Sequence, residues 1–343
     1  MTPIEQILGR YTPAIEQTIQ DALVDASPFV AGVIRYHFGW ANQNFEPARS
    51  ESGKMLRPVL CLLVFEELAG SYQAALPAAA AVEMIHNFSL IHDDIEDNDA
   101  ERRGRPTAWS VWGKPLAINV GDYLYTLAFQ MLTRLDESRF SAATLLAVQR
   151  MMTNACLTLT LGQDLDLRFE QLPLVTSAMY LDMVAKKTGA LLEASILCGA
   201  MLGTSNRQTI DYYHQFAANI GIAFQIQDDI LGIWGDSSQT GKSVDNDLRR
   251  KKKTLPVLHT LNHIDGAQGE ELKSLYLSAE PLTDPQVAFV RRCLEQADAL
   301  PFARQAADGY IEQAYAALNN IKASNRGQTS LELIASYLIN RER

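Results

Sequence analysis

Apolar residues recur at intervals of three and four along almost the whole chain, and this spacing constrains the fold more than any other feature. Such spacing places the residues on one face of an α-helix, whereas a half-buried strand would alternate with a period of two. The clearest stretch covers about six turns and steps through Leu145, Val148, Met152, Ala155, Leu159, Gly162 and Asp166. The 20 glycines and 13 prolines are too few for an all-β protein with many hairpins. The sequence therefore predicts an all-α protein.

Turn-forming residues interrupt the helical spacing at a small number of places, namely 46–58, 98–106, 203–206, 235–256 and 262–269. No Gly/Ser-rich or Pro-rich linker divides the chain, and no fixed repeat is visible. We therefore expect residues 1–343 to form a single domain, a large helical bundle. The stretches 74–82 and 190–202 carry apolar residues on more than one face, which predicts central helices surrounded by others.

The charge balance excludes several classes of function. The chain has 40 acidic and 30 basic residues, a net charge of −10, which argues against nucleic acid or an anionic membrane as the main partner. The four cysteines show no CxxC spacing and lie in apolar stretches, so we expect packed, reduced thiols. The N-terminus lacks the pattern of a targeting segment and no long uninterrupted apolar run occurs. We expect a cytoplasmic protein without a transmembrane segment.

Two acidic clusters each follow an apolar helical stretch. Asp93 and Asp97 are four residues apart on one helix face, with Asp94 between them, after the apolar residues 78–90. Asp228 and Asp229 follow the apolar residues 217–226. A solvated acidic surface would explain one such cluster. Two clusters that face each other would hold Mg²⁺, which prefers carboxylate oxygens, water and phosphate. This pattern indicates a phosphorylated ligand.

Three basic stretches could bind the same ligand: 53–58, 102–106 and 249–253. Arginine offers a planar fork for phosphate oxygens and lysine a point charge, so acids and bases together could hold one diphosphate. A single basic stretch would be an ordinary solvated loop or a weak nucleic-acid patch. Three of them in an acidic chain favour a diphosphate. The inward-facing Gln163 and Asp166 also indicate a polar group at that end of the bundle.

These motifs, over about residues 53–256, resemble those of the trans-isoprenyl diphosphate synthases, an all-α prenyltransferase family that includes farnesyl and geranylgeranyl diphosphate synthases. Residues 92–97, His-Asp-Asp-Ile-Glu-Asp, are similar to the first aspartate-rich motif, and Arg102-Arg103-Gly104 follows at the expected distance. Residues 224–229, Phe-Gln-Ile-Gln-Asp-Asp, are similar to the second. Gly241-Lys242 and residues 251–256 follow it in the family's order.

The resemblance implies the isoprenoid synthase type I fold with a deep central cavity, a homodimer, and three Mg²⁺ per active site. It also implies the substrates, isopentenyl diphosphate and an allylic diphosphate such as dimethylallyl, geranyl or farnesyl diphosphate. Ionisation of the allylic carbon–oxygen bond in a dry pocket would give a cation, which the alkene of isopentenyl diphosphate attacks. The released diphosphate would then accept the proton.

The resemblance also assigns site residues. Metal binding falls to Asp93, Asp94, Asp97 and Asp228, with Asp229 helping through water. The residues implied at the allylic diphosphate are Arg102, Lys187, Lys242 and Lys252. Those implied at isopentenyl diphosphate are Gly53, Lys54, Arg57, His86 and Arg103. The residues implied along the path of the cation are Gln163, Asp166, Thr188 and Gln225. The residues expected to act in catalysis are Asp93, Asp94, Lys187, Thr188, Gln225 and Lys242.

Product length depends, in the family, on an aromatic residue five positions before the first motif, which here is Phe88. Ser89 lies one helical turn below Asp93. A bulky floor beside a small residue predicts a short product, with C20 favoured over C15 and C25.

The chain departs from the family's pattern in two places. Gly232 stands where the second motif ends in aspartate, and Ser52-Gly53-Lys54-Met55 replaces the common Gly-Gly-Lys-Arg. A class I terpene cyclase shares the first acidic motif, but it needs no second substrate and its Asn/Ser/Glu metal motif is not matched around Asp228. A noncatalytic partner subunit is the other alternative, although such subunits tend to lose an aspartate cluster.

Overall fold

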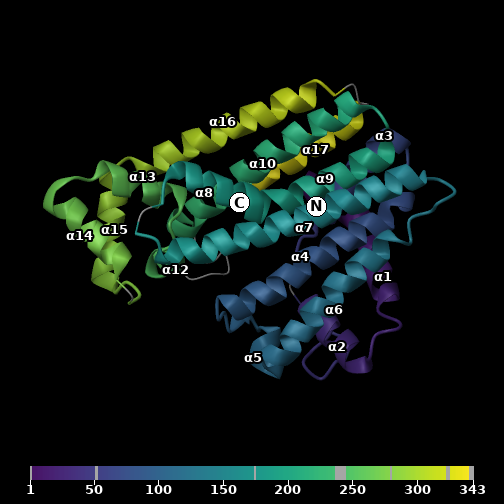
Figure 1. Cartoon of the computed structure of the whole chain (residues 1–343), viewed down its shortest axis with the longest axis horizontal. Coiled ribbons are helices and arrows are strands. Elements are labelled where there is room, and N and C mark those ends of the chain that lie inside the picture. The colour runs from purple at the N-terminus through teal and green to yellow at the C-terminus, as the bar shows by residue number, and fades with distance from the viewer. Residues whose placement is uncertain are drawn as a thin grey trace. The chain divides into compact units, whose positions relative to one another are not determined.

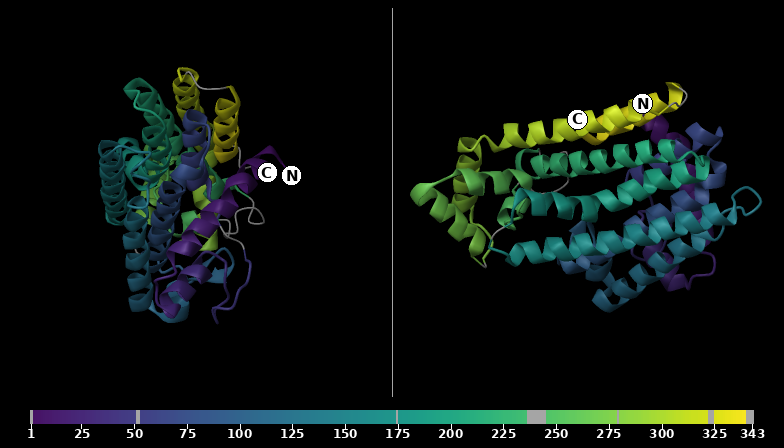
Figure 2. Two further views of the ribbon diagram at one scale, coloured as in Figure 1. Left: turned by 90° about the vertical axis from the view of Figure 1, so that its right-hand side faces the viewer. Right: turned by 45° about the horizontal axis from the view of Figure 1, so that its top comes forward.

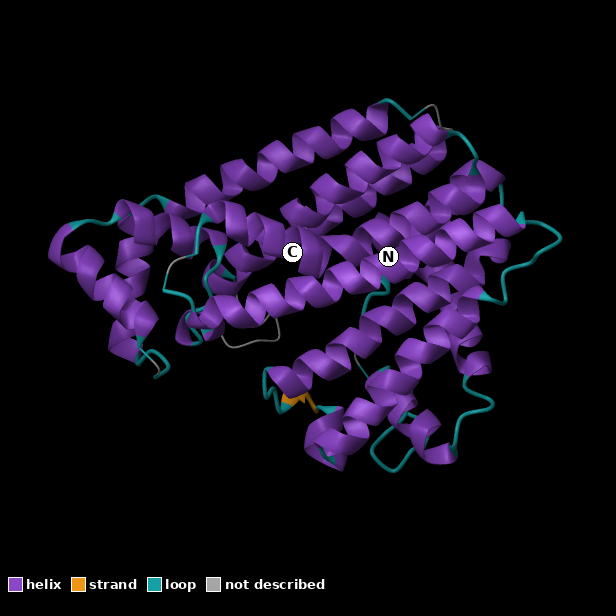
Figure 3. Ribbon diagram, viewed as in Figure 1, coloured by secondary structure: helices purple, strands orange, loops and turns teal. Residues whose placement is uncertain are grey.

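The computed structural model describes residues 2–50, 53–173, 175–235, 245–278, 280–321 and 325–339. Helices dominate the described residues, with one two-stranded hairpin (Figure 3), which confirms the all-α prediction. The helices in the first half of the chain are α1 (Pro3–Ala22), α2 (Pro28–His37), α3 (Leu56–Ala69), η1 (Gln73–Ala75), α4 (Leu76–Glu96), α5 (Ala108–Trp112), α6 (Lys114–Leu132) and α7 (Ala142–Gln171). The hairpin strands are β1 (Glu101–Arg102) and β2 (Arg105–Pro106).

The second half continues with helices only among the described residues. They are α8 (Ser177–Val184), η2 (Ala185–Gly189), α9 (Ala190–Gly203), α10 (Arg207–Trp234), α12 (Asn246–Arg249), α13 (Leu255–His263), α14 (Gly266–Leu277), α15 (Asp284–Gln296), α16 (Ala299–Asn319) and α17 (Asn325–Ile339).

The chain divides into two compact units. Unit 1 consists of Met1–Asn154, Ala194–Ile210 and Lys322–Leu333, and unit 2 of Ala155–Glu193, Asp211–Ile321 and Ile334–Arg343. Helices α7, α9, α10 and α17 contribute residues to both units. Each unit is described below by itself.

Helix α4 is the centre of unit 1. Its four consecutive alanines, residues 78–81, are fully buried, so every face of the helix is covered. Helices α1, α3 and α6 pack against it, and α6 lies along it in Figure 1. In the same unit, α9 approaches α3 closely, because a Cβ at Gly199 would lie 2.3 Å from the carbonyl oxygen of Cys61. The prediction of central helices around residues 74–82 and 190–202 is confirmed.

One described segment, Gln73–Glu96, is long and apolar enough to cross a membrane by length and composition alone. It contains α4, and most of its apolar window is buried inside the protein. A core helix shows burial of this kind, because its apolar side chains pack against other parts of the protein.

The long stripe that begins at Leu145 forms α7, as its spacing predicts. In unit 2 this helix meets η2, a π-helical turn that joins α8 to α9. A Cβ at Gly162 would lie 2.2 Å from the backbone nitrogen of Lys187, so only glycine allows this approach. The glycine therefore fixes where η2, and the side chains it carries, lie against α7.

The rest of unit 2 is a second apolar core. Side chains from α8, α10, α13 and α16 form one buried cluster around Val184, Ile226 and Leu258. Helices α13, α14 and α15 pack against one another beside an end of α16 (Figure 2). Residues from α12, α14 and α15 form a further cluster around Leu248, Leu272 and Val290.

All four cysteines are buried and none forms a disulfide. This confirms the prediction of packed, reduced thiols. Cys61 and Cys198 are close enough for a thiol–thiol contact that raises the pKa of Cys61, together with burial. They stabilise the contact of α3 with α9 inside unit 1.

Candidate functional site

The first acidic motif lies at the C-terminal end of α4. Asp93 and Asp94 are in its last turn, and Asp97 caps it through a hydrogen bond from its backbone nitrogen to the carbonyl oxygen of Asp93, at 2.8 Å. A helix C-terminus carries a partial negative charge, so three carboxyl groups there repel one another and the helix end. This arrangement favours cations near the three side chains.

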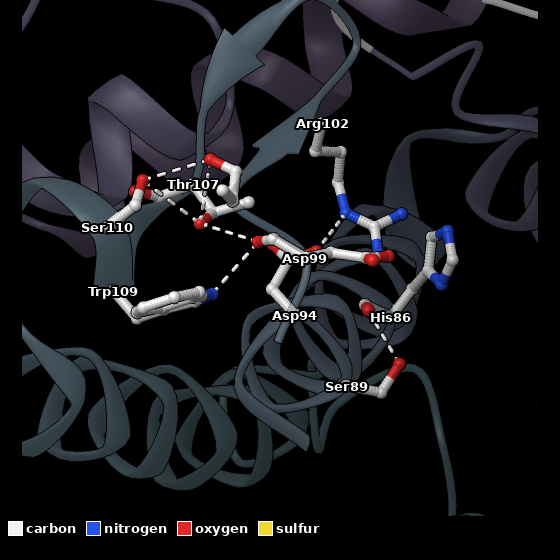
Figure 4. Close-up of polar contacts among 9 residues, drawn as sticks. His86, Ser89, Asp94, Asp99, Arg102, Thr107, Trp109 and Ser110 are labelled. Atoms are coloured by element: carbon white, nitrogen blue, oxygen red, sulfur yellow. Dashed lines mark hydrogen bonds and ion pairs between the residues drawn. The ribbon is translucent and has the colours of Figure 1, made fainter. Parts of the chain in front are cut away.

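Arg102 supplies one such cation. Its Nε donates to Oδ1 of Asp94 at 2.6 Å (Figure 4), and the side chain of Asp94 is only 2% exposed. Burial raises the pKa of Asp94 to about 6, although the charge and hydrogen bond of Arg102 act in the opposite direction. Asp94 is therefore an inward carboxyl group held by arginine, while Asp93 and Asp97 are half-buried.

The hairpin β1–β2 positions Arg102 and Arg103. Arg103 and Gly104 form its two-residue turn and both have positive φ, at 53° and 67°, as a type I′ turn requires. The loop before the hairpin is held by Thr107 and Trp109, which both donate to the carbonyl oxygen of Asp99 at 2.9 Å (Figure 4). This local structure directs neighbouring arginines to different partners.

Four of the five residues expected at isopentenyl diphosphate come together in unit 1. The guanidinium of Arg103 lies against Gly53, where a Cβ would be 2.8 Å from Nη2. Nη1 of Arg57, in the first turn of α3, is 3.4 Å from Nε2 of His86. The fifth residue, Lys54, follows Gly53 in the chain and is exposed.

The field in this cluster is strongly positive. Burial and the charges of Arg57, Arg103 and Arg102 lower the pKa of His86 well below its ordinary value, so its ring is neutral at pH 7. A hollow in unit 1 is lined by Arg102, Arg103, Arg105, Asp94 and His37. Such a site suits an anion with several oxygens.

The second acidic motif lies on α10 in unit 2. Asp229 is 6% exposed and accepts hydrogen bonds from the hydroxyl of Tyr180 and, at 3.0 Å, from Nε2 of Gln225. Burial raises the pKa of Asp229 to about 7, although both hydrogen bonds lower it. Each oxygen of Asp229 therefore has a protein donor, whereas Asp228 is half-buried.

The turn η2 brings further expected residues together. Nζ of Lys187 is 2.5 Å from Oδ2 of Asp166, and Oγ1 of Thr188 donates to Oε1 of Gln225 at 2.7 Å. Gln163 lies on α7 beside this group, one residue after the glycine that admits η2. A π-helical turn at a cluster of polar side chains is a frequent feature of functional sites.

The three consecutive lysines have different partners. Lys253 donates to the carbonyl oxygens of Phe169, at 2.6 Å, and Leu172, near the end of α7, and Lys251 donates to the carbonyl oxygen of Ser278. Lys252 instead lies 3.8 Å from Oδ1 of Asp247. Lys242 and its neighbour Gly241 lie outside the described residues.

The expected chain-length residues lie on α4. The ring of Phe88 is 4.7 Å from that of Tyr125 on α6 and 4.8 Å from that of His92, measured between centroids. The hydroxyl of Ser89 donates to the carbonyl oxygen of His86 at 2.8 Å (Figure 4). Phe88 is thus part of a contact between two helices, and the Ser89 hydroxyl is used within its own helix.

The polyprenyl synthetase family model matches residues 39–293 of this chain. The chain belongs to the polyprenyl synthetase family. The geranylgeranyl diphosphate synthase of Mycobacterium tuberculosis is 40% identical over 84% of this chain and 81% of its own length. The farnesyl diphosphate synthase of Mycobacterium bovis is 33% identical over 98% of this chain and 93% of its own. The structure of a polyprenyl synthetase from Streptomyces coelicolor superposes with a TM-score of 0.90 at 33% identity, covering 98% of this chain and 99% of that one.

These findings confirm the isoprenoid synthase fold and the enzyme class. This polyprenyl synthetase is a trans-prenyltransferase of the short-chain type. The two relatives differ in the product their names give, so the family does not fix the product length.

Several polar residues of this polyprenyl synthetase were not predicted from the sequence. Glu83 is 3% exposed in unit 1, where Nδ2 of Asn87 donates to Oε1 at 2.8 Å, and burial raises the pKa of Glu83 to about 7. Burial and the charges of Arg102 and Arg103 lower the pKa of His37 to about 3. The i, i+4 spacing of Glu83 and Asn87 inside an apolar helix could have predicted their hydrogen bond from the sequence. The hydrogen bond of Tyr180 to Asp229 could not be predicted in this way, because the two residues are 49 positions apart in the sequence.

Proposed function

We propose that this enzyme condenses isopentenyl diphosphate with an allylic diphosphate, head to tail and trans, to give the C20 product geranylgeranyl diphosphate. The observation that carries the proposal is the cluster of Gly53, Arg57, His86 and Arg103 in unit 1. A class I terpene cyclase has one diphosphate substrate and would not need this cluster in addition to its acidic motif. The name of the M. tuberculosis relative supports the same reaction.

The cluster in unit 1 would bind the diphosphate of isopentenyl diphosphate. Arg57 and Arg103 offer guanidinium donors, and Arg57 is in the first turn of α3, where the positive end of the helix dipole favours anions. Because His86 is neutral, it adds a hydrogen-bonding group without adding to the repulsion among the arginines. Lys54 is exposed beside them and could close on the ligand.

The acidic residues fit magnesium as a shared ligand of protein and substrate. Among the residues that the structure describes, no three His, Cys, Asp or Glu side chains form a closed metal cage. Mg²⁺ commonly takes a few carboxylates and completes its shell with water and phosphate oxygens. Asp93 and Asp97 in unit 1 and Asp228 in unit 2 would each contribute carboxylate oxygens to Mg²⁺. Asp94 and Asp229, which already have protein donors, would support these ligands without binding the metal directly. When bound, Mg²⁺ supplies positive charge that stabilises the leaving diphosphate.

The remaining side chains would direct the substrates. Arg102, Lys187, Lys242 and Lys252 would bind the allylic diphosphate and stabilise its charge as the carbon–oxygen bond breaks. Thr188 and Gln225, which are hydrogen-bonded to each other, and the pair Asp166–Lys187 with Gln163 would line the path of the allylic cation. The alkene of isopentenyl diphosphate then forms the new carbon–carbon bond, and the released diphosphate takes the proton.

The C20 product rests on Phe88. Its ring contacts Tyr125 on α6 and so would close the space below the first acidic motif for a longer chain. We further propose that the chain acts as one cytoplasmic domain over residues 1–343 and as a homodimer. Exposed leucines at one-face spacing on α7, Leu146, Leu157 and Leu161, are suited to contact with a second copy.

A product-length assay tests this proposal. The protein is incubated with isopentenyl diphosphate and, separately, with dimethylallyl, geranyl or farnesyl diphosphate, with and without Mg²⁺, and the products are separated by chain length. We expect Mg²⁺-dependent elongation that stops at C20 with each primer. A product that stops at C15 or continues past C20 contradicts the chain length, and absence of elongation with every primer contradicts the function and favours a noncatalytic subunit.

A further inference from the structure

The hairpin β1–β2 carries a third arginine, Arg105, to which no role has been assigned so far. Arg105 lies directly opposite Arg102 in the hairpin register. Like charges at such a pair of positions repel each other and destabilise the hairpin. Asp94 balances the charge of Arg102, whereas the described contacts of Arg105 include no carboxylate. The position of Arg105 therefore needs an explanation other than charge neutralisation.

The guanidinium of Arg105 joins the hairpin to the loop of residues 39–50. Nη1 donates to Oγ of Ser50, and Nη2 donates to the carbonyl oxygen of Ala41 at 3.1 Å. The backbone nitrogen of Ser50 in turn donates to the carbonyl oxygen of Gly39 at 3.0 Å. Two donors of one planar group thus hold two points of the same loop.

Tyr36 on α2 holds the same part of the hairpin from another side. Cζ of Arg105 lies 4.1 Å from the centre of the Tyr36 ring, which is a cation–π contact. The hydroxyl of Tyr36 donates to the carbonyl oxygen of Pro106, the next residue of β2, at 2.7 Å. Tyr36 is only 4% exposed, so its ring and hydroxyl fix β2 against a buried part of unit 1.

The same loop region and the same hairpin also meet in the cluster expected at isopentenyl diphosphate. Gly53, three residues after Ser50, lies against the guanidinium of Arg103, two residues before Arg105. The two segments therefore meet at two neighbouring points, one made by residues expected at the substrate and one made by Arg105. Loss of the second contact would let the hairpin turn shift relative to Gly53.

We propose that Arg105 is a positioning residue for the binding of isopentenyl diphosphate. Its planar fork holds the hairpin turn against the loop, so that Arg103 keeps its place beside Gly53. Arg105 acts through Arg103, because its own guanidinium is used by the loop and by the ring of Tyr36. The inference rests on the proposed function, since it names a residue that arranges that site.

Steady-state kinetics of the full chain test this role. Arg105→Met keeps the apolar stem and removes the guanidinium, and the KM for isopentenyl diphosphate should rise about tenfold. The KM for the allylic substrate and kcat should stay within about twofold of the wild type, because Arg102 has its own anchor in Asp94. Calorimetric titration with isopentenyl diphosphate alone should show the same weakening. An equal rise in both KM values contradicts the proposal.

Arg105→Lys separates positioning from charge. Lysine keeps the positive charge but lacks the planar fork that reaches Ser50 and Ala41 together. We expect a KM for isopentenyl diphosphate close to that of Arg105→Met. A KM equal to that of the wild type would show that the charge alone is needed and would overturn the positioning role.

Ser50→Ala removes a partner of the guanidinium by a much smaller change. It should raise the KM for isopentenyl diphosphate about threefold. The double variant Arg105→Met/Ser50→Ala should not exceed Arg105→Met, because both substitutions remove one shared contact, and additive effects would contradict that contact. The matched control is Arg139→Met, whose guanidinium lies 5.5 Å from the centre of the Phe65 ring in the same unit and should leave both KM values unchanged.

The outcomes separate the two proposals. A wild type that binds isopentenyl diphosphate and elongates a primer, with Arg105→Met and Ser50→Ala behaving alike, overturns the role of Arg105 alone if both match the wild-type KM. A wild type that neither binds isopentenyl diphosphate nor elongates a primer overturns the proposed function together with this inference.

Discussion

Buried carboxyl groups in this protein differ in what holds them. Asp94 faces a guanidinium, Asp229 faces two neutral donors, and Glu83 accepts only from an amide among the described contacts that involve its side chain. In all three, burial outweighs the partners and raises the pKa. The protein thus keeps acids inside, where their ionisation depends on nearby cations.

Glu83 makes the stability of the protein depend on pH. The folded state holds this proton up to about pH 7, whereas the ordinary carboxyl value of the unfolded chain is 4.5. As the pH rises through this window, the unfolded state loses the proton first, so its free energy falls relative to that of the folded state. Its contribution to stability is therefore complete below about pH 4.5 and is lost by about pH 7.

Glu83→Gln removes this titration. Urea unfolding of both proteins at pH 5 and pH 8 should show that the wild type loses about 2.5 kcal/mol more than the variant between these values. The exposed Glu295→Gln serves as the control and should follow the wild type. Parallel losses in wild type and Glu83→Gln would contradict the account of this side chain.

Substitution of Gly53 by alanine adds one carbon and tests the cluster expected at isopentenyl diphosphate. In Gly53→Ala the new methyl group would lie 2.8 Å from Nη2 of Arg103 and must displace the guanidinium. We expect the KM for isopentenyl diphosphate to rise roughly tenfold, since a small displacement of a charged fork weakens its contacts. The KM for the allylic substrate should change much less.

A matched control is available on α16. Gly309→Ala meets no atom within 4 Å and should leave both KM values unchanged. If Gly53→Ala behaves like Gly309→Ala, then Arg103 does not bind isopentenyl diphosphate from this position.

Helix α4 has a buried apolar first half and an acidic C-terminal end. Its alanines and its neighbours α1, α3 and α6 fix the helix, and its last turn holds the acids against the helix dipole. Phe88 lies between these two parts and contacts α6 through Tyr125. The element therefore sets the position of the acids and, in the proposed function, the depth to which a growing product can extend below them.

Phe88→Ala should lengthen the product beyond C20, because truncation of the ring opens the contact between α4 and α6. Chromatography of the dephosphorylated products measures this, with Phe289→Ala on α15 as a control that also truncates a partly buried ring. The truncation should cost of the order of 2 kcal/mol in stability, less than for a fully buried ring. An unchanged product would remove Phe88 from chain-length control.

Periodicity was sufficient to predict the long helices but not the short elements that complete the site. The stripe from Leu145 to Asp166 identified α7, because burial along one face leaves a repeating pattern. The hairpin at Arg102 has two-residue strands, which are too short to show a period. The turn η2 depends on its packing against Gly162, and the contact of Arg105 with Ser50 joins distant residues, so neither leaves a local signal.

At the scale of the whole molecule, the candidate site residues are distributed over two units. Four continuous helices, α7, α9, α10 and α17, contribute residues to both units. Unit 1 holds the first acidic motif and the arginine cluster, and unit 2 holds the second acidic motif with Lys187 and Lys252. The net charge of −10 thus coexists with a local concentration of cations in unit 1. Family membership accounts for the presence of both sets in one chain.

The proposed homodimer has its own test. Leu157 and Leu161 are 61% and 58% exposed, so Leu157→Glu/Leu161→Glu should fold normally. Light scattering after gel filtration should give twice the chain mass for the wild type and one chain mass for the variant. Leu277→Glu, at an exposed position of α14, should remain dimeric. A monomeric wild type, or a variant that stays dimeric, would contradict the use of this face of α7.

The central claim is that both acidic motifs act in one Mg²⁺-dependent elongation. The most direct measurement is the initial rate of incorporation of labelled isopentenyl diphosphate into an allylic primer by wild type, Asp93→Asn and Asp228→Asn at saturating Mg²⁺. We predict that each single variant loses at least about 100-fold in rate while keeping the wild-type melting temperature, because each removes charge that stabilises the leaving diphosphate. A variant of either motif that elongates at the wild-type rate would contradict the account.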